Sequence, residues 1–192
     1  MNHLAHALLA GNDPDYVLGG MLGDFVHGPV PTSWRPGVQA GLRLHRAIDV
    51  YTDSHPVVVA LRNHFQPPYR RYAGIVIDVW FDHLLARDFG RWCAQPLPAF
   101  SLALRELLAQ HGNELPEDLL RFTVYMERYD LPLAYRERAT IARVLGGISN
   151  RLSRANPLAT AIEEAQRLET ELAAAFEAFF PELLRFAEAQ RA

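Results

Sequence analysis

Apolar residues recur at three- and four-residue spacing along nearly the whole chain, and β-branched residues nowhere alternate with polar ones over the length of a strand. The first spacing places apolar side chains on one face of an α-helix, whereas a half-buried strand requires the alternation. The sequence therefore predicts an all-α fold of about nine helices. Their expected ranges are 2–10, 14–24, 38–52, 56–65, 69–92, 97–111, 117–129, 137–152 and 157–189, the last with a kink at Pro181.

The composition predicts one compact domain over residues 1–192. Hydrophobic residues make up 49% of the chain, and a domain of this length buries roughly 70% of the surface that its unfolded chain exposes. A net charge of −3 argues against a general nucleic-acid binder, which neutralises phosphates with basic side chains. No stretch reaches the ~18 consecutive apolar residues of a membrane span, and the single cysteine, Cys93, has no partner for an internal disulfide. We therefore expect a cytoplasmic protein.

The polar chemistry is concentrated in the first half of the chain. Seven of the eight histidines, eight of the ten aspartates and none of the twelve glutamates precede Pro96. Imidazole suits Zn, Fe or Mn, and carboxylate suits Mn or Mg. This distribution indicates a divalent metal site that serves hydrolysis.

Within this half, His45 and Asp49 lie four residues apart in the segment LRLHRAIDVYTD. This spacing places an imidazole and a carboxylate on one helical face. The alternative interpretation is an exposed ion pair that only supports its own helix.

Three polar residues, Asp78, Asp82 and His83, interrupt the apolar segment YAGIVIDVWFDHLL. Asp78 and Asp82 share a helical face, where two like charges repel unless a cation or a shared proton compensates them. A divalent metal is the simplest compensation. The alternative is that the aspartates accept hydrogen bonds from arginine or from helix-terminal N–H groups.

Further candidate ligands lie close to the N-terminus. His3 and His6 share a helical face, although such pairs more often serve packing than ligation. Asp24 follows three glycines in LGGMLGDFVHG that allow two backbone segments to approach closely, although an aspartate here can also cap a turn. The remaining histidines sit beside loop residues, and we expect them on the surface: His27, His55, His64 and His111.

Other catalytic classes lack their signatures. Cys93 has no histidine in a suggestive motif, and the chain has neither a Gly-x-Ser-x-Gly elbow nor a glycine-rich phosphate or dinucleotide loop. The remaining arrangement, His and Asp spread over four helices, is typical of a helical bundle whose ligands converge on one interior metal.

Four segments in register carry a resemblance to a known family: NHLAHALLA, GGMLGDFVHG, GLRLHRAIDVYTDSHP and IDVWFDHLLARDF. Together with the looser GISNRLSRANPL and FEAFFPELL, they resemble the acyl carrier protein phosphodiesterase family over nearly the whole chain. The resemblance implies an all-α fold related to the HD-type metal-dependent phosphohydrolases and a site that prefers manganese, with Mg²⁺, Fe²⁺ or Co²⁺ as alternatives. It also implies hydrolysis of the phosphodiester between 4′-phosphopantetheine and a serine of holo acyl carrier protein.

The adjacent His-Asp pair that marks HD proteins is absent from this chain, and Asp82-His83 has the reverse order. The ligands must therefore be assigned from chemistry. We predict His6, Asp24, His45 and Asp78 as metal ligands, because they come from four separate helices and can surround one ion. Asp49, Asp82 and His83 are then predicted to orient the ligands or transfer protons, with His83 as the proton donor.

Arginine provides the expected contacts with substrate, since the chain contains no lysine. Arg46, beside His45, is predicted to hold a phosphate oxygen. A basic segment between residues 35 and 71 is predicted to steer the acidic carrier protein to the site, through Arg35, Arg43, Arg62, Arg70 and Arg71. Two alternatives remain open: an HD-like phosphohydrolase for a small nucleotide or phosphodiester, and a helical module that binds the carrier protein without turning it over.

Overall fold

The computed structural model describes residues 1–192 and contains ten α-helices, five short 3-10 helices and no strand, which confirms the predicted all-α class. The α-helices are α1 (His3–Leu9), α2 (Pro14–Leu22), α3 (Pro36–Ser54), α4 (Pro56–Arg62), α5 (Ala73–Arg87), α6 (Leu97–Gln110), α7 (Glu117–Tyr129), α8 (Arg138–Arg151), α9 (Ala161–Arg167) and α10 (Glu169–Arg191). All ten contribute to one core of 45 buried hydrophobic residues. None of them combines the length and hydropathy needed to cross a membrane.

Local sequence signals explain where several helices begin. The Asp13 side chain accepts hydrogen bonds from the N–H groups of Asp15 and Tyr16, and Pro14 occupies the first position of α2. Proline also begins α3 and α4, where its fixed φ suits the first turn and its missing N–H costs nothing. The starts of α2 and α4 match the expected ranges, whereas α3 begins at Pro36, two residues before its expected start.

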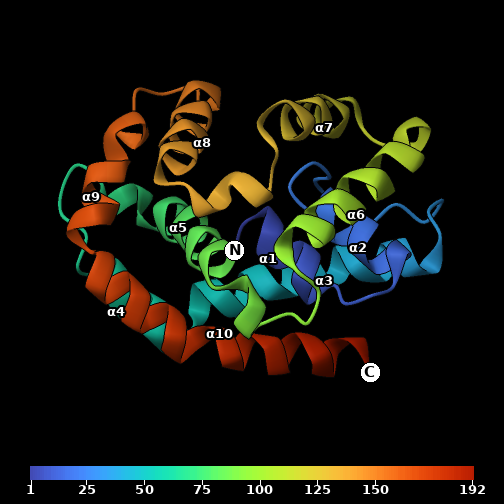
Figure 1. Cartoon of the computed structure of the whole chain (residues 1–192), viewed down its shortest axis with the longest axis horizontal. Helices are drawn as coiled ribbons and strands as arrows, with labels where there is room; N and C mark the ends of the chain where they lie inside the picture. Colours follow the sequence, from blue (N-terminus) through green and yellow to red (C-terminus); the bar gives the residue numbers. More distant parts are fainter.

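Helix α5 runs through the interior of the protein, and Figure 1 shows the other helices arranged around it. Eleven of its 15 residues are buried, because it packs against α1, α8, α9 and α10. Helices α1, α2 and α3 pack together beside it. This arrangement brings the aspartates and histidines of the first half of the chain toward one region.

Two predicted helices differ most from the structure. The expected helix 69–92 is shorter, because 3-10 turns over Arg70–Tyr72 and Phe89–Arg91 flank α5. The expected helix 157–189 is interrupted at Leu168, which separates α9 from α10 and raises the count from nine to ten. Leu168 is buried within an unbroken apolar pattern, so no glycine or proline marks this break.

Pro181 lies inside α10 without ending it. A proline ring removes one helical hydrogen bond and clashes with the preceding turn, which bends a helix. Helix α10 visibly changes direction along its length in Figure 1, and the bend lets it pack against α3, α4 and α5. The predicted kink is consistent with this shape.

Candidate metal centre

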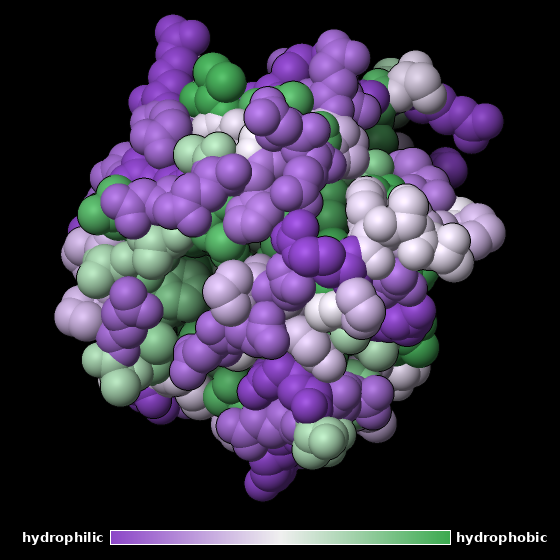
Figure 2. Space-filling model, turned by 90° about the vertical axis from the view of Figure 1, so that its right-hand side faces the viewer, coloured by the Kyte–Doolittle hydropathy of each residue, from purple (hydrophilic) through white to green (hydrophobic).

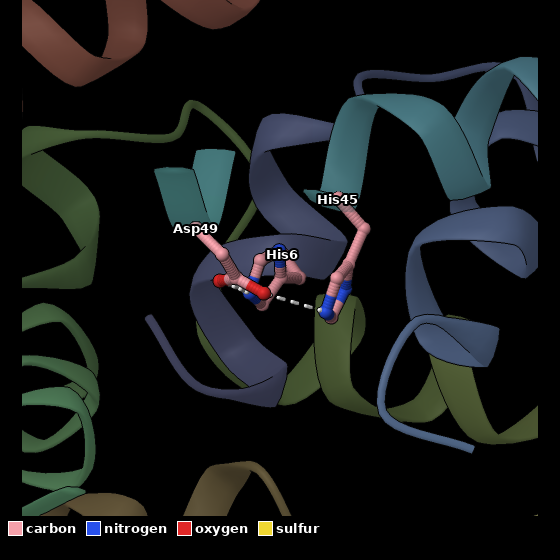
Figure 3. Close-up of side chains that lie close together, drawn as sticks. All are labelled: His6, His45 and Asp49. Carbon is pink, nitrogen blue, oxygen red and sulfur yellow. Dashed lines mark ion pairs between the residues drawn. The ribbon is translucent and has the colours of Figure 1, made fainter. Parts of the chain in front are cut away.

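Helices α1 and α3 bring two imidazoles and a carboxylate together (Figure 3). His45 and Asp49 lie one turn apart on α3, with His45 Nε2 3.1 Å from Asp49 Oδ2. His6 approaches from α1, with Nε2 3.1 Å from Asp49 Oδ1. The two imidazole rings stack with centroids 3.6 Å apart. His6 and His45 are buried, whereas the Asp49 side chain is 41% exposed, so the group opens toward solvent on the carboxylate side.

A fourth side chain, Asp24, comes from the turn after α2. Its Oδ1 lies 3.6 Å from His45 Nε2, and its Oδ2 lies 3.4 Å from Nδ1 of His3. We call His6, Asp24, His45 and Asp49 the metal-site cluster.

Close packing of α2 on α3 positions His45. A Cβ at Gly19 would lie 2.2 Å from the carbonyl oxygen of Val38, and a Cβ at Gly23 would lie 2.1 Å from the His45 ring. The predicted close approach at this glycine-rich segment is therefore confirmed. The approach also lets His45 Nδ1 donate a hydrogen bond to the carbonyl oxygen of Gly20 at 2.7 Å. Such a bond fixes the ring so that Nε2 faces the cluster.

The Gly23→Ala variant should lower the affinity for Mn²⁺ at least about 10-fold, because groups that orient a metal-binding histidine typically contribute 10- to 100-fold. The added methyl group would displace the His45 ring. Isothermal titration calorimetry with Mn²⁺ measures the effect. Gly90→Ala is the control, since a Cβ there meets nothing within 4 Å. Equal Mn²⁺ affinity in the two variants would contradict this role for Gly23.

The charges in the cluster are strongly coupled. Burial alone would lower the pKa of His45, but its ion pairs with Asp24 and Asp49 outweigh burial and raise that pKa to about 9. Burial, together with the charge of the stacked His45, lowers the pKa of His6 to about 4. Burial alone would raise the pKa values of Asp24 and Asp49, but the neighbouring histidines hold both well below their usual range. At neutral pH the cluster therefore holds two carboxylates and one imidazolium.

The residues present fit a divalent cation. Donor atoms that share one ion at about 2.1 Å lie roughly 3.0–3.4 Å apart, which matches the 3.1 Å between Asp49 and each histidine. His6, His45 and Asp49 each offer one ligand atom within 4.8 Å of the others. Both ring nitrogens of His6 are buried, and neither has a hydrogen-bond partner of normal geometry. A cation would bind the His6 nitrogen that lies beside Asp49 without a well-aligned hydrogen bond.

Asp78, a predicted ligand, lies at the edge of this group. Its Oδ1 is 3.0 Å from the amino group of Met1, which also lies 3.6 Å from Asp49 Oδ1. Burial raises the pKa of Asp78, although the amino group opposes this shift. The structure therefore brings Asp49 into direct contact with both imidazoles and leaves Asp78 in contact with the amino group.

Asp82 accepts hydrogen bonds from the N–H groups of Leu4 (2.8 Å) and Ala5 (3.0 Å) in the first turn of α1. Asp82 therefore serves as a partner for helix-terminal N–H groups, which is the alternative interpretation given above. Burial raises its pKa to about 7 despite these two donors. Asp82 positions α1, the helix that carries His6.

His83 and Arg46 both bond to backbone carbonyl groups. His83 Nδ1 donates to the carbonyl oxygen of Tyr135 at 2.8 Å, and the residue is 3% exposed. Arg46 Nη2 donates to Val26 at 2.9 Å, beside the turn that holds Asp24. The predicted roles of His83 as proton donor and of Arg46 as phosphate ligand stay predictions.

Sequence analysis missed the position of His3 and misplaced His55. His3 lines a cavity of about 770 Å³ that adjoins the cluster through Asp24 and Asp78. Burial, together with the charges of His45 and Arg151, lowers the pKa of His3 to about 4, although the charge of Asp24 opposes this shift. The only feature of the sequence that pointed to His3 was the helical face it shares with His6.

His55 is buried rather than on the surface, because its ring accepts the N–H of Val57 at the start of α4 and packs against Phe179.

The sequence as a whole is similar to those of known proteins. The profile of the family described as acyl carrier protein phosphodiesterase matches residues 1–183. The chain belongs to this family. A relative named acyl carrier protein phosphodiesterase from Photorhabdus laumondii is 33% identical over 189 residues, which cover 98% of this chain and 96% of the relative. One of the same name from Escherichia coli is 32% identical over 185 residues, which cover 96% of each. No solved structure matches the chain.

Membership of the acyl carrier protein phosphodiesterase family confirms the resemblance of the sequence motifs. It makes the chain a phosphodiesterase and implies hydrolysis of holo acyl carrier protein to the apo form. An enzyme is therefore favoured over a module that only binds the carrier protein. The relation to HD-type phosphohydrolases stays a prediction.

Proposed function

We propose that the chain hydrolyses the phosphodiester between 4′-phosphopantetheine and a serine of holo acyl carrier protein, with a divalent cation held by the metal-site cluster. The observation that carries the proposal is the buried pair of imidazoles that share one carboxylate at the edge of a cavity. Family membership supplies the carrier protein as substrate. The proposal places Asp49 among the ligands in place of Asp78, and it places the enzyme in the cytoplasm.

The donor set narrows the choice of cation. Two imidazoles with two carboxylates suit Mn, Fe, Co or Zn better than Mg, which prefers oxygen ligands. We propose Mn²⁺, in line with the resemblance of the sequence. A divalent cation supplies Lewis-acid stabilisation of phosphate oxygens and activation of water.

Without a cation, the charges of the site are partly balanced by its own side chains. The imidazolium of His45 neutralises one of the two carboxylates, Asp24 and Asp49, and the proton on its Nε2 must leave before this nitrogen can bind a cation. Cation binding therefore releases a proton, and the affinity should rise with pH. Because Nδ1 of His83 is held by the carbonyl oxygen of Tyr135, the predicted proton donation would have to come from Nε2.

The decisive experiment is incubation with holo acyl carrier protein and Mn²⁺, followed by intact mass spectrometry. The expected result is apo carrier protein and free 4′-phosphopantetheine, with activity abolished by a chelator and restored by Mn²⁺. Full activity in a metal-free preparation would contradict the metal site. Turnover of a nucleotide or another small diester without turnover of holo carrier protein would favour the alternative phosphohydrolase.

The surface offers arginines for an acidic partner. Within the predicted basic segment, Arg35 pairs with Asp15 and Glu114, and Arg62 pairs with Asp53. The other three have neutral neighbours: Arg43 bonds to Gln39, Arg70 to Asn63, and Arg71 lies against the ring of Tyr72. On the face shown in Figure 2, hydrophilic side chains predominate and apolar ones form small groups. We propose that charge guides docking, through Arg43, Arg70 and Arg71.

Changing both Arg70 and Arg71 to Glu should lower kcat/KM for holo carrier protein about 10-fold at low salt. The physical reason is loss of electrostatic steering, which salt screens. Steady-state kinetics at several salt concentrations check this result. The control changes Arg136 and Arg185, also exposed, to Glu, which alters the net charge equally. Equal losses in the two double variants would exclude a docking role for this pair.

A further inference from the structure

The cavity beside the metal-site cluster has one wall formed by helix α8. Four residues of this helix line it at the spacing of a single face: Val144, Gly147, Ile148 and Arg151. The opposite walls come from α5, α7 and the segment before α1, and 11 of the 19 lining residues are hydrophobic. The cavity therefore offers mainly apolar contact together with several charged side chains, among them Asp24 and Asp78 where it meets the cluster.

Gly147 lacks a packing reason for being glycine. A Cβ at this position would meet no atom within 4 Å, so no neighbouring part of the protein requires the absent side chain. Glycine within a helix costs roughly 1 kcal/mol relative to alanine. A ligand that lies against the backbone of α8 would explain why this position stays free of a side chain.

Arg151 lies on the same face one turn further along α8. Its side chain makes no ion pair or hydrogen bond with the rest of the protein, unlike that of Arg121 across the cavity, which pairs with Glu117 and Asp118. Arg151 lines the same cavity as His3 and Asp24. An unpaired guanidinium at this place suits a phosphate group.

The size of the cavity determines which part of the substrate enters. A phosphodiester at the cluster carries the serine of a folded protein on one ester oxygen and a flexible arm on the other. A cavity of about 770 Å³ lies within the range of small-molecule sites, roughly 300–1,000 Å³, and cannot admit a protein domain. Hence only the arm enters. Its methyl groups and methylene chain match the apolar walls.

On the basis of the proposed function, we propose that the cavity binds the pantetheine arm of the substrate, which passes along α8 at Gly147 with its phosphate beside Arg151. The arm is then held before hydrolysis, and it leaves as 4′-phosphopantetheine. Gly147 acts as a specificity determinant because a side chain there would occupy the path of the arm.

The test compares Gly147→Leu with Gly146→Leu. Gly146 also has no atom within 4 Å of an added Cβ, but it does not line the cavity, so both variants change helix propensity equally. We expect Gly147→Leu to raise KM for holo carrier protein at least 10-fold and Gly146→Leu to keep wild-type kinetics. Hydrolysis of methyl p-nitrophenyl phosphate, which has no arm, should change less than 2-fold in either variant. Thermal unfolding should show that both variants are folded.

A binding measurement separates this inference from the proposed function. Calorimetric titration with 4′-phosphopantetheine should give binding to the wild type and to Gly146→Leu, and binding at least 10-fold weaker to Gly147→Leu and to Arg151→Gln. Equal binding by all four proteins, or equal KM values for the two leucine variants, would overturn the inference. Failure of the wild type to hydrolyse holo carrier protein would instead contradict the proposed function.

Discussion

Asp49→Asn should lower the turnover of holo acyl carrier protein by more than about 100-fold and release the bound metal. Groups that only support a metal ligand contribute roughly 10- to 100-fold, so loss of a ligand should exceed that range. Asp49 lies 3.1 Å from both His6 and His45, and no other carboxylate contacts both. Metal content after gel filtration and product formation by intact mass measure the two effects.

Two further variants make this prediction specific. Asp53→Asn removes a carboxylate one turn along the same helix, where it is exposed and pairs with Arg62, and it should retain metal and activity. Asp78→Asn distinguishes the two ligand sets, because the sequence favoured Asp78 whereas the structure places it against the amino group of Met1. Metal retention by Asp49→Asn together with metal loss by Asp78→Asn would reverse our assignment.

Much of the fold follows from local signals in the sequence. Apolar spacing predicts the helices, and an aspartate or proline marks where α2, α3 and α4 begin. The break at Leu168 has no such signal, because the apolar pattern continues through it and the bend serves the packing of α10 on distant helices. Local sequence specifies how a helix begins, but only tertiary packing specifies where this one is interrupted.

The same distinction applies to the candidate site. The pairing of His45 with Asp49 follows from their spacing on α3. Asp78 and Asp82 have equivalent spacing on α5, yet one faces an amino group and the other the first turn of α1. Their different environments depend on how α1 packs on α5, which no local pattern encodes. The role proposed for Gly147 likewise depends on a cavity between helices far apart in sequence.

Asp82→Ala should lower the free energy of unfolding by about 2–5 kcal/mol. The change leaves the buried N–H groups of Leu4 and Ala5 without an acceptor, and each such group costs about 1–3 kcal/mol. The residue before α1, Asn2, provides no side-chain cap that could replace the lost bonds. For a protein of this size the melting temperature should fall by roughly 5–15 °C. Urea unfolding and thermal unfolding followed by circular dichroism measure both quantities.

Comparing the loss of stability with the loss of turnover in the same variant tests the role of Asp82. Because Asp82 anchors the helix that carries His6, turnover should fall together with stability in Asp82→Ala. The Asp82→Asn variant keeps one acceptor oxygen, so its turnover and its free energy of unfolding should both be intermediate. Asp88→Ala, which removes an aspartate paired with Arg87 at the end of α5, should change the free energy of unfolding by less than about 0.5 kcal/mol. A large loss of turnover in Asp82→Ala with an unchanged melting temperature would instead support the proton-transfer role predicted from the sequence. Parallel losses would establish Asp82 as the residue that holds α1, and with it His6, against the rest of the metal-site cluster.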